Sequence, residues 1–121
     1  MARENQIQVM AFSNLASASY VELQMAQADE SPCNLPQVTE IATRYSKTAA
    51  QVLLRWAVQR GTAAIPKSSK VERLVENMTI FDFNLSQAEM GVIDSLNKNR
   101  RFNDPGVFCE AAFGTFCPIY D

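Results

Sequence analysis

The densest group of side chains able to bind an anion lies where a short apolar run meets a helical pattern. Residues 65–69 read Ile-Pro-Lys-Ser-Ser, and Arg73 follows one helical turn later. A helix amino terminus presents free backbone N–H groups and the positive end of a dipole. Lys67, Ser68, Ser69 and Arg73 add donors and positive charge that would suit a phosphate. The alternative is that Ser69 only caps the helix, while Lys67 and Arg73 are solvated.

Phe12 and Ser13 form a second candidate, at the end of an apolar run that alternates with period two. Ligands of α/β folds gather at the carboxyl ends of parallel strands, where an aromatic ring can stack on a flat ligand. A phenylalanine at a strand end is otherwise a core residue. Glu76 and Asn77 share the helix of Arg73, and each taken alone is typical of a helix surface.

The chain lacks the residue types on which many catalytic centres depend. It has no histidine, and so no Ser–His pair, Cys–His pair or histidine metal ligand. Cys33, Cys109 and Cys117 are widely spaced without a C-x-x-C pair, which indicates reduced thiols rather than a zinc site or disulfides. No glycine-rich phosphate loop is present. We therefore expect no catalytic residue and no metal site.

Composition narrows the class of protein. The 121 residues are 47% hydrophobic and 20% charged, with a formal net charge of −2, as in soluble globular domains. This charge gives no support to nucleic-acid binding, and no apolar run approaches the ~18 residues of a membrane span. The amino terminus lacks the apolar run of a signal peptide, so we expect a cytoplasmic protein that binds neither nucleic acid nor membrane.

Short strands and helices must hold these residues in place. Alternation predicts a strand over Ile7–Phe12, and Ala63–Pro66 predicts a second, buried strand that ends at its proline. Residues 13–36 read as loop, with room for a helical turn over 20–28. The two strands are joined by a helical crossover, which favours a parallel pair. Because parallel sheets normally contain several strands covered on both faces, the pattern is typical of a slice of an α/β protein.

Capping boxes mark three helix starts, at Thr48–Gln51, Ser69–Glu72 and Ser86–Glu89. An earlier helix begins at Gln37, and Gly61 stands where a helix C-terminal glycine belongs. Apolar residues at helical spacing are expected to face inward in all four helices. They are Val38, Ile41, Ala42 and Tyr45 in the first helix, Val52, Leu53, Trp56 and Ala57 in the second, Val71, Leu74, Val75 and Met78 in the third, and Met90, Ile93 and Leu96 in the fourth.

Several stretches together resemble the aldo-keto reductases, which are NADPH-dependent enzymes built on a (β/α)8 barrel. The stretches are Ala49–Trp56, Ala64–Ser69 and Glu72–Asn77, supported by Ile7–Ser13, which is similar to the family's seventh strand, and by Phe81–Ser86. Residues 101–105 and 118–121 look most like the xylose reductase and aldose reductase branch. The resemblance implies that residues 1–121 are one α/β unit, the C-terminal part of a TIM barrel with about two strands and their helices. An added helix and a C-terminal substrate loop over residues 100–121 complete it.

The resemblance also implies roles at the adenosine end of NADPH. Lys67, Ser68 and Arg73 match the positions that bind the 2′-phosphate, and Ser69 lies in the same loop. Glu76 and Asn77 match the positions that hydrogen-bond the adenine. Lys67, Ser68, Ser69 and Arg73 are the residues already singled out as an anion site.

At the other end of the cofactor, Phe12 matches the aromatic ring that stacks on the nicotinamide. Ser13, Leu15 and Ser17 match the loop that runs along the pyrophosphate. This loop departs from the family's usual Ser-Pro-Leu-Gly, because Asn14 stands in place of proline and Ala16 in place of glycine. The aromatic tail, with Phe108, Cys109, Phe113 and Phe116, matches the loop that shapes the substrate pocket.

The residues that the family uses for catalysis have no counterpart in this sequence, and this bears on activity. In the family a tyrosine acts as general acid, assisted by an aspartate, a lysine and a histidine, while the nicotinamide delivers hydride to the carbonyl. These residues lie on earlier strands, and none of their motifs occurs here. We therefore expect the C-terminal portion of a reductase of aldehydes or aldoses that is inactive alone and needs the missing part of the barrel. The alternative is a non-catalytic truncated paralogue that binds NADPH or docks on a full-length reductase.

Overall fold

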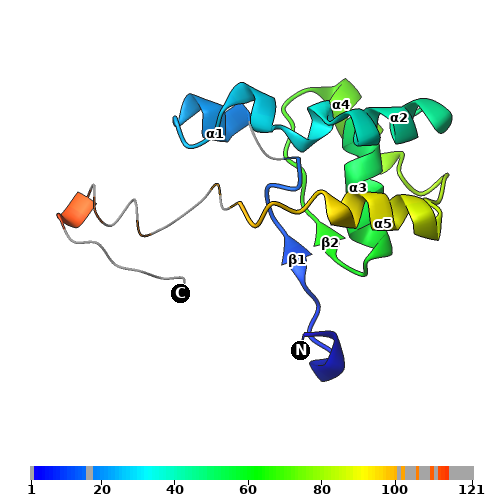
Figure 1. Ribbon diagram of the computed structural model, residues 1–121, viewed down its shortest axis with the longest axis horizontal. Coiled ribbons are helices and arrows are strands. Elements are labelled where there is room, and N and C mark those ends of the chain that lie inside the picture. Colours follow the sequence, from blue (N-terminus) through cyan, green and yellow to red (C-terminus); the bar gives the residue numbers. More distant parts are fainter. Residues whose placement is uncertain are drawn as a thin grey trace.

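The computed structural model describes residues 2–15 and 18–100, together with residues 102, 106, 110 and 112–114. Ser17, Cys109, Cys117 and the tail aromatics Phe108, Phe116 and Tyr120 lie outside the described residues. Along the chain the elements are the 3-10 turn η1 (Arg3–Asn5), β1 (Met10–Ala11), α1 (Ala18–Glu22), the 3-10 turns η2 (Ala28–Glu30) and η3 (Pro32–Asn34), α2 (Pro36–Arg44), α3 (Ala49–Gln59), β2 (Ala63–Ala64), α4 (Val71–Met78) and α5 (Gln87–Ser95) (Figure 1).

The two strands pair in parallel, with Met10 opposite Ala63 and Ala11 opposite Ala64. The prediction of a parallel pair joined by a helical crossover is therefore confirmed. Both strands are shorter than predicted, and β2 is half-buried rather than buried. The physical reason is that a strand needs a neighbour along its whole length. Beyond these residues the pairing adds only the bond from the Ala63 N–H to the Val9 carbonyl, at 2.9 Å.

The hydrophobic core lies among α2, α3 and α5, which gather beside the strand pair (Figure 1). Val38, Ile41, Val52 and Leu54 are its fully buried side chains. The apolar stripes predicted for α2 and α3 supply most of them, and Met90 and Ile93 of α5 are buried as expected. Within the described residues no helix has the length and apolar character needed to cross a membrane.

Two of the three predicted capping boxes are confirmed. The Gln51 N–H donates to Thr48 Oγ1 at 3.2 Å and starts α3, and the Glu89 N–H donates to Ser86 Oγ at 3.3 Å and starts α5. The box predicted at Ser69–Glu72 is wrong. Helix α4 begins one residue later, so that Lys70 is its N-cap residue and no side chain caps the helix.

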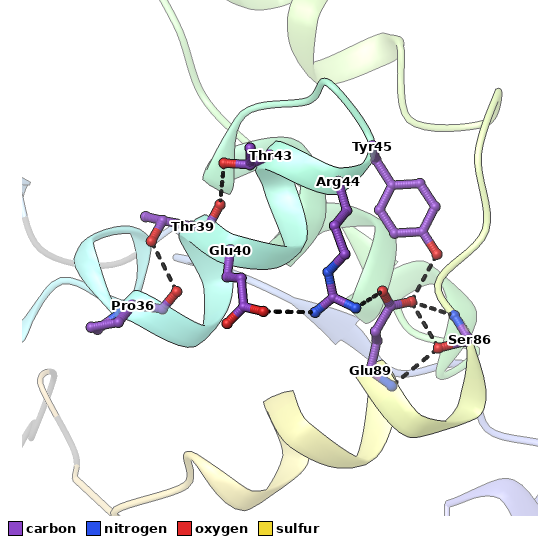
Figure 2. A network of polar contacts seen from close by, with 8 residues as sticks. All are labelled: Pro36, Thr39, Glu40, Thr43, Arg44, Tyr45, Ser86 and Glu89. Carbon is purple, nitrogen blue, oxygen red and sulfur yellow. Dashed lines mark hydrogen bonds and ion pairs between the residues drawn. The ribbon is translucent and has the colours of Figure 1, made fainter.

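The Glu89 carboxylate connects α5 to the end of α2 (Figure 2). It is buried, and its Oε2 accepts hydrogen bonds from the Tyr45 hydroxyl at 2.7 Å and from the Ser86 N–H at 2.8 Å. Arg44 lies 3.3 Å from Oε1, and it also pairs with Glu40. A buried carboxylate with this many donors is stabilised in its ionised form.

Replacing this carboxylate should alter the pH dependence of stability. Burial would raise the Glu89 pKa, but the Ser86 and Tyr45 hydrogen bonds and the Arg44 charge together hold it below its ordinary value. The stabilisation is therefore present above the unfolded-state pKa, near 4.5, and is lost as pH falls through the lower folded-state pKa. Thermal unfolding from pH 7 to pH 3 should show a smaller decline in Tm for Glu89→Gln than for wild type. Glu40→Gln, at an exposed partner of Arg44, should keep the wild-type decline; equal declines in all three proteins would contradict the assignment.

Candidate functional site

The parallel pairing brings the two predicted groups to one edge of the sheet. Phe12 and Ser13 follow β1, and Lys67 and Ser68 follow β2, so both groups lie at the carboxyl ends of the paired strands. This edge is where α/β folds bind ligands. Helix α4, which begins shortly after β2, carries Arg73, Glu76 and Asn77.

The start of α4 has the properties of an anion site. Lys67, Ser69 and Arg73 are exposed, and within the described part of the chain neither basic side chain has a hydrogen bond or an ion pair. Because no side chain caps α4, the N–H groups of its first turn are not occupied by a capping oxygen. Two free cations beside an open helix amino terminus suit a phosphate group.

Ser68 shapes the turn that leads into α4. Its hydroxyl accepts a hydrogen bond from the Lys70 N–H at 3.1 Å and lies 3.3 Å from the Lys70 carbonyl. This local bond gives Ser68 a positioning role in the turn. It also explains why the box predicted from Ser69 does not form, because the chain turns around Ser68 instead.

Glu76 and Asn77 lie at different surfaces of α4. Glu76 Oε1 accepts a hydrogen bond from the Thr48 hydroxyl at 2.5 Å, and the Glu76 carbonyl accepts one from Gln51 Nε2 at 3.1 Å. Glu76 therefore connects α4 to the capping box of α3, and its second carboxylate oxygen is without a partner in the part that the structure describes. Asn77 is half-buried at an apolar pocket of about 570 Å³ between α3, β2 and α4.

At the end of β1, the predicted residues differ in exposure. The Phe12 side chain is 63% exposed, so the interpretation of Phe12 as a core residue is wrong and its ring is accessible. Ser13 has a φ of +54°, a left-handed conformation that costs a non-glycine residue about 1–2 kcal/mol. Leu15 is half-buried against the hydrophobic core.

Sequence reasoning missed the contact that holds this loop. The hydroxyls of Ser13 and Tyr20 lie 2.8 Å apart, and the Tyr20 ring stacks on Phe102 with 5.7 Å between ring centroids. A tyrosine seven residues beyond a serine in loop sequence carries no signal for such a contact. Tyr20 therefore links the loop after β1 to α1.

A second cavity, of about 690 Å³, lies between the end of β1, α3 and α5. The polar side chains that line it bond largely to one another. Trp56 Nε1 donates to Asp94 Oδ1 at 2.8 Å, and Arg60 pairs with the same carboxylate. Asn14 Oδ1 is buried there without a hydrogen-bond partner among the described residues.

No proton-transfer centre forms around the described tyrosines. The Tyr45 hydroxyl donates to Glu89, and this hydrogen bond raises the Tyr45 pKa. The described residues contain no group of three cysteine, aspartate or glutamate side chains placed to hold a metal ion. Cys33 is a free thiol whose pKa is raised by burial.

Comparison with known proteins finds one family repeatedly. Residues 1–98 match the Aldo/keto reductase family. A probable NAD(P)H-dependent D-xylose reductase of Aspergillus clavatus is 39% identical, over 98% of this chain and 38% of its own length. The NAD(P)H-dependent D-xylose reductase of Kluyveromyces lactis is 44% identical, over 91% of this chain and 34% of its own length.

The solved structures agree. The crystal structure of a Bombyx mori aldo-keto reductase in complex with NADP superposes with a TM-score of 0.74 at 32% identity, covering 88% of this chain and 34% of that one. An aldo-keto reductase from a deep-sea metagenome library gives a TM-score of 0.70 at 30% identity, over 83% of this chain and 34% of that one. This chain thus spans about a third of the length of the curated relatives it matches.

Proposed function

Because this chain belongs to the aldo/keto reductase family, we propose that it is the carboxyl-terminal, cofactor-binding part of an NADPH-dependent carbonyl reductase. Strands β1 and β2 would be the last two strands of a (β/α)8 barrel, α5 an added helix, and residues 100–121 the substrate loop. The observation that carries the proposal is the pair of free cations, Lys67 and Arg73, beside the uncapped start of α4.

Each binding residue has a defined task in this proposal. Lys67 and Arg73 bind the adenosine 2′-phosphate, with the hydroxyls of Ser68 and Ser69 beside them. This assignment agrees with the anion site described above, where Lys67 and Arg73 would offer a phosphate donors that are otherwise unused.

Glu76 and Asn77 would hydrogen-bond the edge of the adenine. Glu76 keeps one carboxylate oxygen on Thr48, which fixes the side chain while the other oxygen is left to accept from the adenine amine. The half-buried Asn77 amide supplies both donors and an acceptor.

Phe12 supplies an accessible ring at the carboxyl end of β1 for stacking on the nicotinamide. Ser13, Leu15 and Ser17 belong to the loop along the pyrophosphate, which Tyr20 holds through the Ser13 hydroxyl. When NADPH is bound, it supplies the hydride that converts a carbonyl to an alcohol. The chain itself supplies binding and orientation.

The substrate of the complete enzyme would be an aldehyde or an aldose. The named relatives are D-xylose reductases, and this chain covers only about a third of their length. The rest of the barrel would supply the proton donor, so the proposed partner is that missing part. A truncated paralogue that binds NADPH or docks on a full-length reductase is the second candidate.

Replacing Arg73 by alanine tests the 2′-phosphate role. A charged hydrogen bond of this kind contributes roughly 1.5–3 kcal/mol, so the Kd for NADPH should rise about 10- to 100-fold. The Kd for NADH, which lacks the 2′-phosphate, should change little. Fluorescence titration of the purified chain measures both values.

Arg60→Ala is the matched control, because Arg60 precedes β2 and so lies at the opposite end of the strand. Its surface ion pair with Asp94 contributes little to stability, and NADPH affinity should stay unchanged. Equal weakening of NADPH and NADH in Arg73→Ala would argue against the 2′-phosphate role.

A further inference from the structure

Helix α4 is bonded to the start of α3 through its polar side. Its apolar stripe is exposed, contrary to the prediction that it faces inward; the stripe consists of Val71, Leu74, Val75 and Met78. The hydrogen bonds from Thr48 and Gln51 instead meet Glu76 and the carbonyl of Thr79, the residue that ends the helix. The position of Glu76 is therefore set by α3 as well as by its own helix.

Gln51 holds the backbone of Glu76. The Gln51 side chain is buried, and its Nε2 donates to the Glu76 carbonyl at 3.1 Å and to the Thr79 carbonyl at 2.9 Å. Its Oε1 accepts a hydrogen bond from the Thr48 N–H at 3.0 Å. Because both polar atoms of this buried amide are bonded, moving the end of α4 would leave them unsatisfied, at a considerable cost. The Glu76 backbone is thus fixed relative to the start of α3.

Thr48 holds the carboxylate of the same residue. Its hydroxyl accepts a hydrogen bond from the Gln51 N–H at 3.2 Å and donates its one proton to Glu76 Oε1 at 2.5 Å. Among the residues that the structure describes, Glu76 has no ion pair, and its other carboxylate oxygen has no hydrogen-bond donor. Since backbone and side chain are both held, this second oxygen is a charged acceptor in a fixed place.

We propose that Thr48 is a positioning residue through which this chain selects a 6-aminopurine over a 6-oxopurine. The inference rests on the proposed place of the adenine at Glu76 and Asn77. A 6-amino group donates to the Glu76 carboxylate, whereas the 6-oxo group of hypoxanthine or guanine sets one acceptor oxygen against another. The Asn77 amide can turn to offer either a donor or an acceptor. Discrimination between the two kinds of base therefore depends on Glu76.

Selection of this kind needs a carboxylate that cannot move away from the wrong base. An unrestrained glutamate side chain would rotate away from a 6-oxo group, and the repulsion would then disappear. The bond from Thr48 removes this freedom, so a 6-oxopurine would meet a charged acceptor that has no partner. Rejection of the wrong ligand by unfavourable contacts is a common source of specificity. In this arrangement Thr48 acts on the base only through Glu76.

Three variants separate this role from the capping role of Thr48, which is also the N-cap residue of α3. Thr48→Ser keeps both the capping oxygen and the proton for Glu76. Thr48→Asp keeps a capping oxygen, since aspartate is a good N-cap residue, but has no proton to donate. Ser86→Ala removes the equivalent cap from α5 and leaves Thr48 and Glu76 intact, so it is the matched control for loss of a cap.

Fluorescence titration of the purified chain with NADPH, and with the analogue that carries hypoxanthine in place of adenine, gives the ratio of the two Kd values. The wild-type chain should bind NADPH about tenfold more tightly than the analogue. Thr48→Ser should keep this ratio, and Thr48→Asp should reduce it to about twofold or less. Ser86→Ala should lower the Tm and keep the wild-type ratio. Circular dichroism checks that each variant is folded.

Several results would overturn the proposal: equal affinities of the wild-type chain for the two bases, an unchanged ratio in Thr48→Asp, a lost ratio in Thr48→Ser, or a ratio lost equally in Ser86→Ala. Titration with NADH separates these outcomes from failure of the proposed function. A preference for NADPH over NADH without selection of the base overturns only the role of Thr48. Failure of the wild-type chain to bind NADPH overturns both.

Discussion

Purified alone, this chain is expected to oxidise NADPH in the presence of xylose or glyceraldehyde no faster than buffer does. Carbonyl reduction needs a proton donor beside the carbonyl oxygen as well as a hydride. The chain has no histidine, and the described tyrosine hydroxyls are held by other partners. Spectrophotometry at 340 nm measures the rate, with the full-length Kluyveromyces lactis enzyme as positive control.

The interpretation of this result depends on whether the hydroxyl of Tyr20 or Tyr45 could act as a proton donor. Tyr20 is bonded to Ser13, and Tyr45 donates to Glu89, which raises the Tyr45 pKa and makes it a weaker acid. If turnover were nevertheless found, Tyr20→Phe and Tyr45→Phe would show whether either hydroxyl is responsible. Clear turnover by the wild-type chain would contradict the proposal of a binding part that lacks the proton donor.

Leu54→Ala is expected to destabilise the chain by about 2–5 kcal/mol. Leu54 is fully buried in the core between α2, α3 and α5, and it also lines the apolar pocket between α3, β2 and α4. Removing it leaves a cavity that the surrounding helices fill only in part. Because the total stability of a domain is typically 5–15 kcal/mol, this loss is a large fraction of the whole. Urea unfolding followed by circular dichroism measures it.

The control is Val92→Ala on α5, where the side chain is exposed. A surface change of this kind stays within about 0.5 kcal/mol, so its unfolding midpoint should match that of the wild type. Equal midpoints for Leu54→Ala and Val92→Ala would mean that the core described here does not carry the stability of the chain.

Helix boundaries were predictable where the signal is local. Thr48 and Ser86 each have their partner three residues later, and both capping boxes form. Ser69 has the same spacing to Glu72, but Ser68 bonds to the Lys70 backbone first, so α4 starts later and without a cap. A sequence pattern cannot rank two adjacent serines that compete for one turn.

Burial of the α4 stripe was not predictable, because it depends on what lies opposite. The spacing of Val71, Leu74, Val75 and Met78 correctly identifies an apolar face but not its cover. For the same reason the strand expected over Ile7–Phe12 is only Met10–Ala11, since a strand needs a partner along its length. In both places the sequence pattern indicates packing neighbours that the described residues do not include.

The site residues divide in a similar way. The chemistry of Lys67 and Arg73 is visible in the sequence, and the structure leaves both side chains exposed at the start of α4. The bond between Glu76 and Thr48 and the contact between Ser13 and Tyr20 depend on how helices and loops pack. Such contacts join residues with no recognisable spacing, so they emerge only from the folded chain.

The central claim is that this chain carries the part of the fold that recognises NADPH. Thermal unfolding of the purified chain with NADPH, and separately with NADH at the same concentration, tests it most directly. A ligand at 100 times its Kd stabilises the folded state by about 2.7 kcal/mol, so NADPH should raise the Tm by several degrees and NADH by much less. A Tm unchanged by NADPH, or raised equally by both nucleotides, would contradict the claim.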